Sequence, residues 1–359
     1  MVITDDQILQ RVAARSPFAN NRNISTPVSV EWRISRVERN STASLQRLDS
    51  LPLELLHQCV EYLDLASIRN FSQVSLRANS IVHSLRKLAI LLKIASIAID
   101  VLVQTETIKL HSLDSLYTAL HITACVSCGC YGPYLHIFSG ERCCQTCFEL
   151  NQSLWMISLQ TAKECFGLTN QQSKALPVMR TIPGLYHLYH PPRIHNKIVH
   201  LTSVRAAKEL AIRINGPIDD TDINPPFNQF IMRYLKLALW MWYLKATLQP
   251  LSEEQHLSFV EALKPQDPYF GMGGVHFASV VNRRIELGWW CRTCQEVFQK
   301  FIHHKLEPDV LARLVPEGRR AKRYLEVMAS RAWSEAAIIE HAKRTHLYDM
   351  LDDVNVGSS

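Results

Sequence analysis

Glycine is scarce in this sequence, and its scarcity argues against a turn-dense β protein. The chain has 12 glycines in 359 residues, about half of what an average usage of about 7% would supply. Long stretches rich in Leu, Ile and Ala accompany this shortage, and these residues favour helices. The sequence therefore predicts a mainly α fold.

Signals for export and for membrane insertion are also lacking. The first ten residues, MVITDDQILQ, carry acids where a signal peptide needs positive charge. The most apolar run, residues 88–103, is interrupted by Lys93 and Asp100 and falls short of the roughly 20 residues of a membrane span. We expect an intracellular protein of the cytoplasm, the nucleus or both, with an Arg- and Ser-rich flexible arm over residues 1–46.

Catalytic signatures are missing as well. The chain has no HExxH helix, no GxxxxGK[ST] loop and no GxGxxG after a strand. Neither CxxC follows a proline, as the Pro-Cys-x-x-Cys of a zinc deaminase would require. The sequence predicts no catalysis of its own. A zinc hydrolase stays an alternative, and it would need a metal with an open coordination position.

Cysteine, in contrast, is present in two groups that indicate metal sites. In an intracellular protein the ten cysteines stay reduced, so clustered thiols favour metal ligands over disulfides. The first group is Cys125-x2-Cys128, fifteen residues, then Cys144-x2-Cys147, a spacing typical of four-cysteine zinc sites. It predicts a closed structural zinc module over residues 122–150. Cys143 is the weaker candidate, because only Cys144 makes a CxxC with Cys147.

The second group is Cys291-x2-Cys294, which has no later CxxC to complete it. His341 and His346 lie on a predicted helix with a His-x4-His spacing, which falls within the range of zinc sites. His303 or His304 is the competing choice, although adjacent histidines point to different faces of a helix. A chain without a second metal is the remaining alternative.

Helical periodicity covers most of the rest. Pro52 precedes a Leu-rich helix, Asp64 or Ser67 caps a short second one, and Ser75 starts a long helix that runs to about residue 102. Further helices are predicted over residues 113–120, 151–168 and 204–214, after Pro225–Pro226, and over 311–350 as one or two basic helices. Residues 275–281 and 284–290 predict two strands around the turn Asn282–Arg283.

The segment from Leu48 to Ser75 has more leucine than so short a unit can bury by itself, so it needs a partner or a neighbouring domain. It resembles the F-box motif, and the matching residues are Leu51, Pro52, Glu54, Leu55, Leu56, Tyr62, Leu63, Leu65, Ile68, Phe71, Val74 and Ser75. Ala78 stands where many F-boxes carry Trp. The segments SLYTALHITACVSCGCYGPYL and ELGWWCRTC are similar to those of a group of fungal F-box proteins. His346 stands where that group usually has a Cys as the last ligand.

The resemblance implies a role in protein recognition. F-box proteins dock on the Skp adaptor of SCF-type cullin–RING ubiquitin ligases and hold a substrate with the rest of the chain. The residues that match the apolar docking face are Leu51, Pro52, Leu55, Leu56, Leu63 and Ile68. The implied organisation is an F-box over 47–88, a helical connector over 89–121, the zinc module, and a substrate-binding α-rich domain over 151–359 with the second zinc.

A nuclear zinc protein that contacts nucleic acid is the alternative function. It would use the basic C-terminal helices, where Arg313, Arg319, Arg320, Lys322, Arg323 and Arg331 gather. Few aromatic residues interleave these charges, so a platform for base stacking is lacking. A solvated helix face explains the same pattern.

Overall fold

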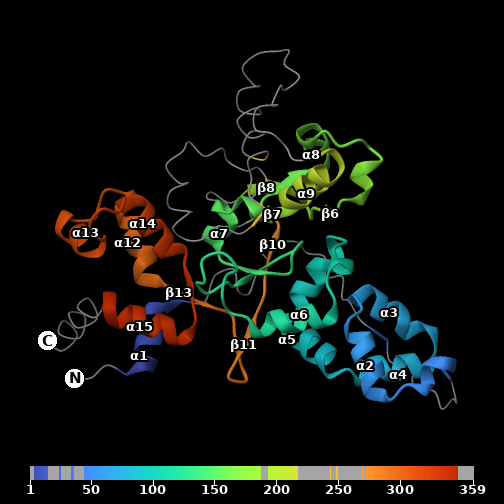
Figure 1. Cartoon of the computed structure of the whole chain (residues 1–359). Coiled ribbons are helices and arrows are strands. Elements are labelled where there is room, and N and C mark those ends of the chain that lie inside the picture. The colour runs from blue at the N-terminus through green and yellow to red at the C-terminus, as the bar shows by residue number, and fades with distance from the viewer. Residues whose placement is uncertain are drawn as a thin grey trace.

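The computed structural model describes residues 4–14, 24–25, 34–35, 44–186, 193–216, 243, 248–249, 269 and 272–346. The helix predicted after Pro225–Pro226 lies outside these residues, as do residues 347–350 of the last basic segment. The described structure is mostly helical with small sheets of two or three strands, which confirms the mainly α prediction (Figure 1). None of the described helices combines the length and the hydrophobicity needed to cross a bilayer.

The F-box region is a compact set of short helices. The 3₁₀ turn η1 (Gln46–Ser50) leads to α2 (Leu53–Glu61), α3 (Leu65–Val74) and α4 (Leu76–Ser84). The side chains of Asp64 and Ser75 accept backbone N–H groups three residues ahead and so begin α3 and α4. Leu56, Leu65 and Ile68 are buried between the helices.

The long helix predicted from Ser75 is two helices in the structure. Leu85 has an extended backbone (φ −69°, ψ 106°) and separates α4 from α5 (Arg86–Gln104). The Leu85 side chain is buried, so the break keeps an apolar residue in the core while α5 changes direction. The turn η2 (Ile108–Leu110) and α6 (Leu113–His121, capped by Ser112 as predicted) follow.

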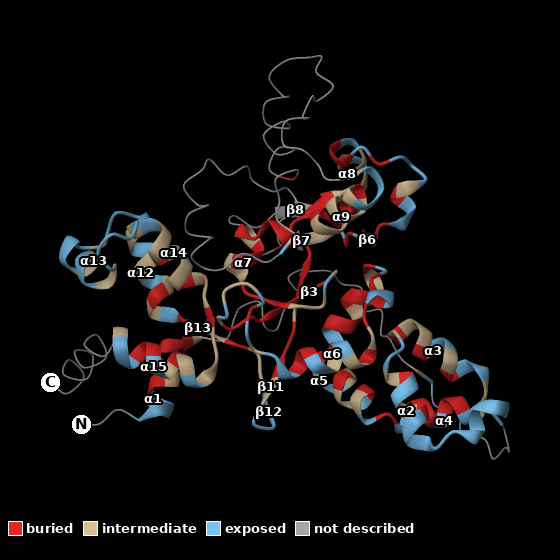
Figure 2. Cartoon of the chain, in the orientation of Figure 1, coloured by how far each residue is buried: buried red, intermediate tan, exposed pale blue. Residues whose placement is uncertain are grey.

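The connector packs directly against the F-box. Lys87 on α5 pairs with Glu61 at 2.8 Å and with Asp114 at 2.6 Å, and the N–H of Leu113 donates to the carbonyl of Leu63 at 2.9 Å. One apolar core extends from Leu56 in α2 to Phe277 in the second half of the chain. Its buried residues are among those coloured red in Figure 2. The F-box is therefore joined to the rest by packed helices.

The middle of the chain contains several small sheets. Strands β3 (Tyr134–His136) and β4 (Arg142–Cys143) form a hairpin that β10 (Gly274–His276) extends, and α7 (Gln145–Leu150) follows β4. A second sheet has the order β5–β9–β6, with β5 (Met156–Ser158), β6 (Met179–Arg180) and β9 (His200–Ser203). A third has the order β2–β7–β8, with β2 (Ile24–Ser25), β7 (Gly184–Tyr186) and β8 (Arg193–His195).

The helix predicted over 151–168 was wrong in its first half. Residues 152–158 form the turn η3 (Gln152–Leu154) and β5, and only α8 (Leu159–Phe166) is helical. Trp155, Met156 and Ile157 are buried in succession, which suits a strand covered on both faces and no helix with a solvent side. The turn η4 (Gln172–Ala175) and α9 (Val204–Asn215) complete this region, with Ser203 capping α9 as predicted.

The C-terminal region begins with the predicted hairpin, β11 (Ser279–Val281) and β12 (Arg284–Glu286). Strand β13 (Trp289–Cys291) leads into α12 (Arg292–Ile302), α13 (Pro308–Leu314) and α14 (Ala321–Ser330), and β14 (Ala332–Trp333) precedes α15 (Glu335–Thr345). The segment predicted as one or two basic helices thus contains three helices and a strand.

The N-terminal residues differ most from the expected flexible arm. Helix α1 (Asp5–Val12) and strand β1 (Ala13–Ala14) lie against the C-terminal region, where β1 pairs with β13 and Asp5 forms an ion pair with Lys343 (Figure 1). Ile8 and Val12 are 1% and 2% exposed in a core shared with Ile338 and Ala342. Residues 5–14 are therefore a structural part of the C-terminal region.

The packing of α1 predicts that a distant substitution will loosen the C-terminal region. Ile8→Ala leaves a cavity beside α15, and truncating a buried Ile to Ala costs about 2–5 kcal/mol of stability. We expect faster hydrogen–deuterium exchange over residues 289–346, measured by mass spectrometry. Gln10→Ala, on the exposed face of α1, is the matched control, and exchange unchanged by Ile8→Ala would show that α1 is a free arm.

Candidate functional site

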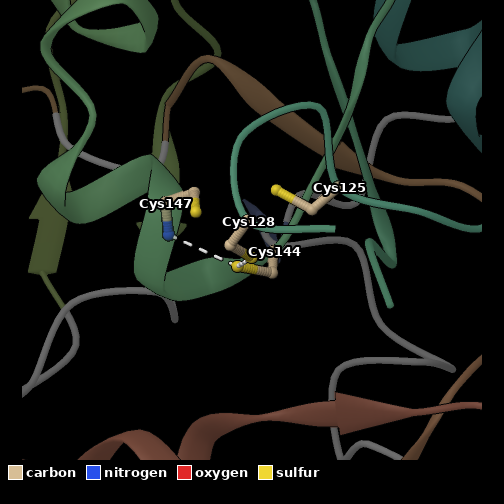
Figure 3. Close-up of side chains that lie close together, drawn as sticks. All are labelled: Cys125, Cys128, Cys144 and Cys147. Atoms are coloured by element: carbon tan, nitrogen blue, oxygen red, sulfur yellow. Dashed lines mark hydrogen bonds between the residues drawn. The ribbon is translucent and has the colours of Figure 1, made fainter. Parts of the chain in front are cut away.

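The first cluster of metal-binding character brings together Cys125, Cys128, Cys144 and Cys147, here called the four-cysteine cluster. Their sulfur atoms all lie within 4.8 Å of one another, and the Sγ atoms of Cys128 and Cys144 are 3.6 Å apart. Figure 3 shows the four side chains converging from a loop and from the start of α7. The predicted ligand set is therefore gathered at one point.

Local backbone geometry forms each half of this cluster. In the first half, the N–H of Gly129 donates to the carbonyl of Cys125 at 3.0 Å, and Gly129 takes the left-handed conformation (φ 73°) that closes the tight turn. In the second half, Cys144 is the N-cap of α7, and its Sγ accepts the N–H of Cys147 at 3.4 Å. The hairpin β3–β4 connects the two halves and turns them toward each other.

The remaining cysteines of this stretch lie outside the cluster. Cys143 points away from it, because its thiol donates to the carbonyl of Glu141 at 3.7 Å, and burial raises the pKa of the Cys143 thiol. Within the cluster, hydrogen bonds from the other three thiols, Cys128 first, hold the pKa of Cys125 well below its usual range. Metal ligands of this kind are thiolates, so clustered thiols release their protons when a metal ion binds.

The second cluster, here called the Cys/His cluster, contains Cys291, Cys294, His341 and His346. Nε2 of His346 lies 3.4 Å from Sγ of Cys291 and 3.3 Å from Sγ of Cys294, and Nε2 of His341 lies 3.3 Å from Sγ of Cys294. All four residues are buried. His303 and His304 are exposed beyond the end of α12, so the structure selects His341 and His346 between the two choices.

The surroundings of the Cys/His cluster fix its ligands in place. Cys291 is the N-cap of α12 and accepts the N–H of Cys294 at 3.4 Å, and a hydrogen bond from Cys294 lowers the pKa of Cys291 to about 3. The ring of Trp333 stacks on His341 with 4.6 Å between centroids. Oγ1 of Thr345 lies 3.3 Å from Nδ1 of His341, a contact that orients the imidazole for binding through Nε2.

Each cluster offers four nitrogen or sulfur ligands without a carboxylate, so each could hold one metal ion. Four protein ligands complete the usual tetrahedral shell of such ions and leave no position for water or substrate. The arrangement therefore fits structural sites and argues against a hydrolytic metal.

The F-box region exposes an apolar surface made by part of the predicted docking set. Leu51, Leu55 and Leu63 are 36%, 45% and 37% exposed, and Pro52 is exposed beside them. Leu56 and Ile68, also predicted for the docking face, are 3% and 0% exposed and are not part of this exposed surface. They face inward, where they pack the helices that carry the exposed residues.

Three further apolar residues in or next to these helices were missed as surface candidates. Leu53 is 42% exposed, Tyr62 is 74% exposed and Val74 is 72% exposed. Tyr62 and Val74 belong to the residues that match the F-box motif, so the resemblance contained a signal for them. Leu53 carries no such signal, because it falls between the motif positions.

The basic residues of the C-terminal helices do not form one unpaired face. Arg323 pairs with Glu326 at 2.8 Å and with Glu149 at 3.6 Å. The guanidinium of Arg331 lies 5.3 Å from the ring centre of Trp333. These contacts tie two of the predicted phosphate-binding side chains into the protein.

The four-cysteine cluster predicts a selective loss of metal. Cys128→Ser removes one of four thiolates, so we expect the purified chain to lose about one metal ion while the other cluster keeps its own. Elemental analysis by mass spectrometry measures the metal content. The control is Cys165→Ser, a buried thiol of α8 outside both groups; equal metal loss in both variants would contradict the assignment.

The Cys/His cluster predicts a contrast between histidines. We expect His346→Ala to lower the metal content by about one ion per chain, because it removes a buried ligand. His304→Ala should leave the content unchanged. Elemental analysis combined with a cobalt-substituted absorption spectrum reports both the amount and the thiolate ligation. A fall in metal content with His304→Ala would return the exposed pair to consideration.

Comparison with known proteins adds one domain assignment. The F-box domain family matches residues 48–89, the segment that forms η1, α2, α3, α4 and the start of α5. No curated protein and no solved structure matches the chain. F-box domains bind the Skp adaptor in cullin–RING ubiquitin ligases, and the proteins that carry them are generally non-catalytic subunits. The chain therefore contains an F-box domain, which it joins to two Cys/His groups able to hold metal ions.

Proposed function

We propose that the chain is the substrate-receptor subunit of an SCF-type cullin–RING ubiquitin ligase. The observation that carries this proposal is the exposed apolar surface of Leu51, Pro52, Leu55 and Leu63 within a matched F-box domain. Burying such a patch against the Skp adaptor contributes about 25 cal/mol per Å² of apolar area, before the costs of association. The chain would act in the cytoplasm or nucleus and would leave ubiquitin transfer to its partners.

The connector supports this role because it holds the F-box in a defined direction. The two carboxylates, Asp114 first, raise the pKa of Lys87, so this ammonium stays charged between α2 and α6. The two ion pairs of Lys87 are partly exposed and contribute little to stability by themselves. They set the register of α5 against α2, while the apolar core supplies the stability.

We further propose that both clusters hold Zn²⁺ as a structural ion. Four thiolates, or two thiolates with two imidazoles, are the donor sets typical of closed zinc sites. Such sites contribute apparent binding energies on the order of 10–16 kcal/mol, and this energy supports folding where the apo site is disordered. The residues that follow the F-box would then hold a substrate protein on a scaffold stabilised by metal.

Adaptor binding gives the direct test. We expect titration calorimetry of the metal-loaded chain against the Skp adaptor to show submicromolar affinity. Leu51→Ala combined with Pro52→Ala should weaken binding by about tenfold or more, because it truncates the exposed apolar face. Ile194→Ala removes an even more exposed apolar side chain elsewhere and should bind like the wild type.

Two outcomes would contradict the proposal. One is the absence of binding by folded, metal-loaded chain. The other is an equal loss with Ile194→Ala, which would indicate non-specific apolar association. Cys128→Ser should keep adaptor binding, since the exposed F-box residues lie on other helices and the apolar residues around the four cysteines form a group separate from the core that holds the F-box.

A further inference from the structure

The hairpin β11–β12 projects from the body of the molecule between the F-box side and the C-terminal helices (Figure 1). Its two strands pair in the register Ser279–Glu286, Val280–Ile285 and Val281–Arg284. The turn residues Asn282 and Arg283 both have positive φ, 48° and 64°. This is the geometry of a tight two-residue hairpin turn, and the second position usually holds Gly. An arginine there has an unfavourable backbone conformation. Its side chain places a cation at the tip.

The base of the hairpin is anchored by buried polar contacts. Arg142 is 2% exposed, and its guanidinium donates to the carbonyls of Phe277 and Ala278 at 2.6 and 3.2 Å. The hydroxyls of Tyr131 and Ser279 lie 2.7 Å apart. A ring nitrogen of His276 lies 2.9 Å from the carbonyl of Leu287. Both strands are therefore held at their roots, and the tip is presented in a fixed orientation.

The tip carries positive charge that no described residue neutralises in an ion pair. Arg283 and Arg284 are exposed, and no ion pair among the described residues includes either of them. Glu286, at the base, is half-buried and keeps one carboxylate oxygen inside the protein. Ile285 lies between these charges and is 53% exposed. The surface thus combines two cations with one large apolar side chain.

One edge of β12 has no partner strand in the described part of the chain. Strand β12 pairs with β11 on one side, and β11 contacts α6. A strand edge of this kind offers backbone N–H and C=O groups to an extended peptide, which adds to the sheet as a further strand. The backbone then supplies affinity, and side chains on alternate positions supply specificity.

We propose that β12 binds an extended, acidic segment of a substrate protein as an added strand. Carboxylates of that segment would lie against Arg283 and Arg284, and an apolar side chain would cover Ile285. This inference rests on the proposed receptor function, which supplies the reason for capturing another protein. It names the chemistry of the captured segment.

Charge decides between this occupant and the others. A second copy paired antiparallel about Ile285 would set Arg284 opposite the half-buried Glu286 and Arg283 opposite Leu287, so Arg283 would face no counter-charge. Single-stranded nucleic acid needs aromatic side chains for stacking, and residues 279–286 contain none. An acidic peptide satisfies the two arginines and the apolar residue together.

The test uses the full chain without the adaptor and a short fluorescein-labelled peptide of alternating Glu and Val. We expect fluorescence anisotropy to report saturable binding. A peptide with Lys in place of Glu should not bind. A peptide with alternate backbone amides N-methylated should bind about tenfold more weakly or worse, because it cannot complete the strand ladder. If the methylated peptide binds as tightly as the unmodified one, charge attraction alone accounts for the binding and the proposal is overturned.

Variants locate the contact on the hairpin. Arg283→Glu combined with Arg284→Glu should weaken peptide binding by about tenfold or more and leave adaptor affinity unchanged, which separates this inference from the proposed function. Arg319→Glu combined with Lys322→Glu makes the same charge change at an exposed site elsewhere and should bind normally. The absence of peptide binding by the wild-type chain would overturn the proposal. A loss of peptide binding in the Arg319→Glu/Lys322→Glu variant alone would also overturn it. Self-association in sedimentation that Ile285→Asn abolishes would also overturn it, in favour of a second copy.

Discussion

Convergence of four metal-binding side chains at each of two points is the constraint on which the structure after the connector depends. Each cluster uses a CxxC pair whose first cysteine caps a helix and accepts the N–H of the second. Bringing these thiols together without a metal would leave polar groups crowded in the interior. A bound metal ion would coordinate these groups, and its binding free energy would stabilise the folded state. Short strands and helices such as β4 and α7 then need little apolar core of their own.

The surroundings of the Cys/His cluster also show why residues 5–14 lie against residues 289–345. Cys291 is at the end of β13, the central strand of a small sheet, and β1 and β14 pair on its two sides. The N-terminal strand therefore covers the backbone that carries a ligand, while α1 adds Ile8 and Val12 to the core beside α15. Residues separated by most of the sequence thus form one unit around the ligands.

The F-box side follows a different principle, since an apolar core without a metal group holds its described helices together. Leu56 and Ile68 fill the interior, whereas Leu51 and Leu55 stay at the surface. This division explains why so small a domain contains so much leucine. The buried residues stabilise the helices, and the exposed residues form an apolar surface that is free to contact another protein. The break at Leu85 separates α4 from α5, and α5 contacts the central strand β10.

The sequence alone determined the local features that depend on neighbouring residues. The caps at Ser75 and Ser203, the turn at Asn282–Arg283 and both CxxC pairs were all predicted, because capping, turn chemistry and ligand spacing act over a few residues. It also contained an overlooked signal for α1, the capping box of Thr4 and Gln7. Only the tertiary structure decided the rest. It brought His341 and His346 beside Cys291 and Cys294, turned Leu56 and Ile68 inward and paired β1 with β13, since these outcomes depend on contacts between segments that are far apart in the sequence.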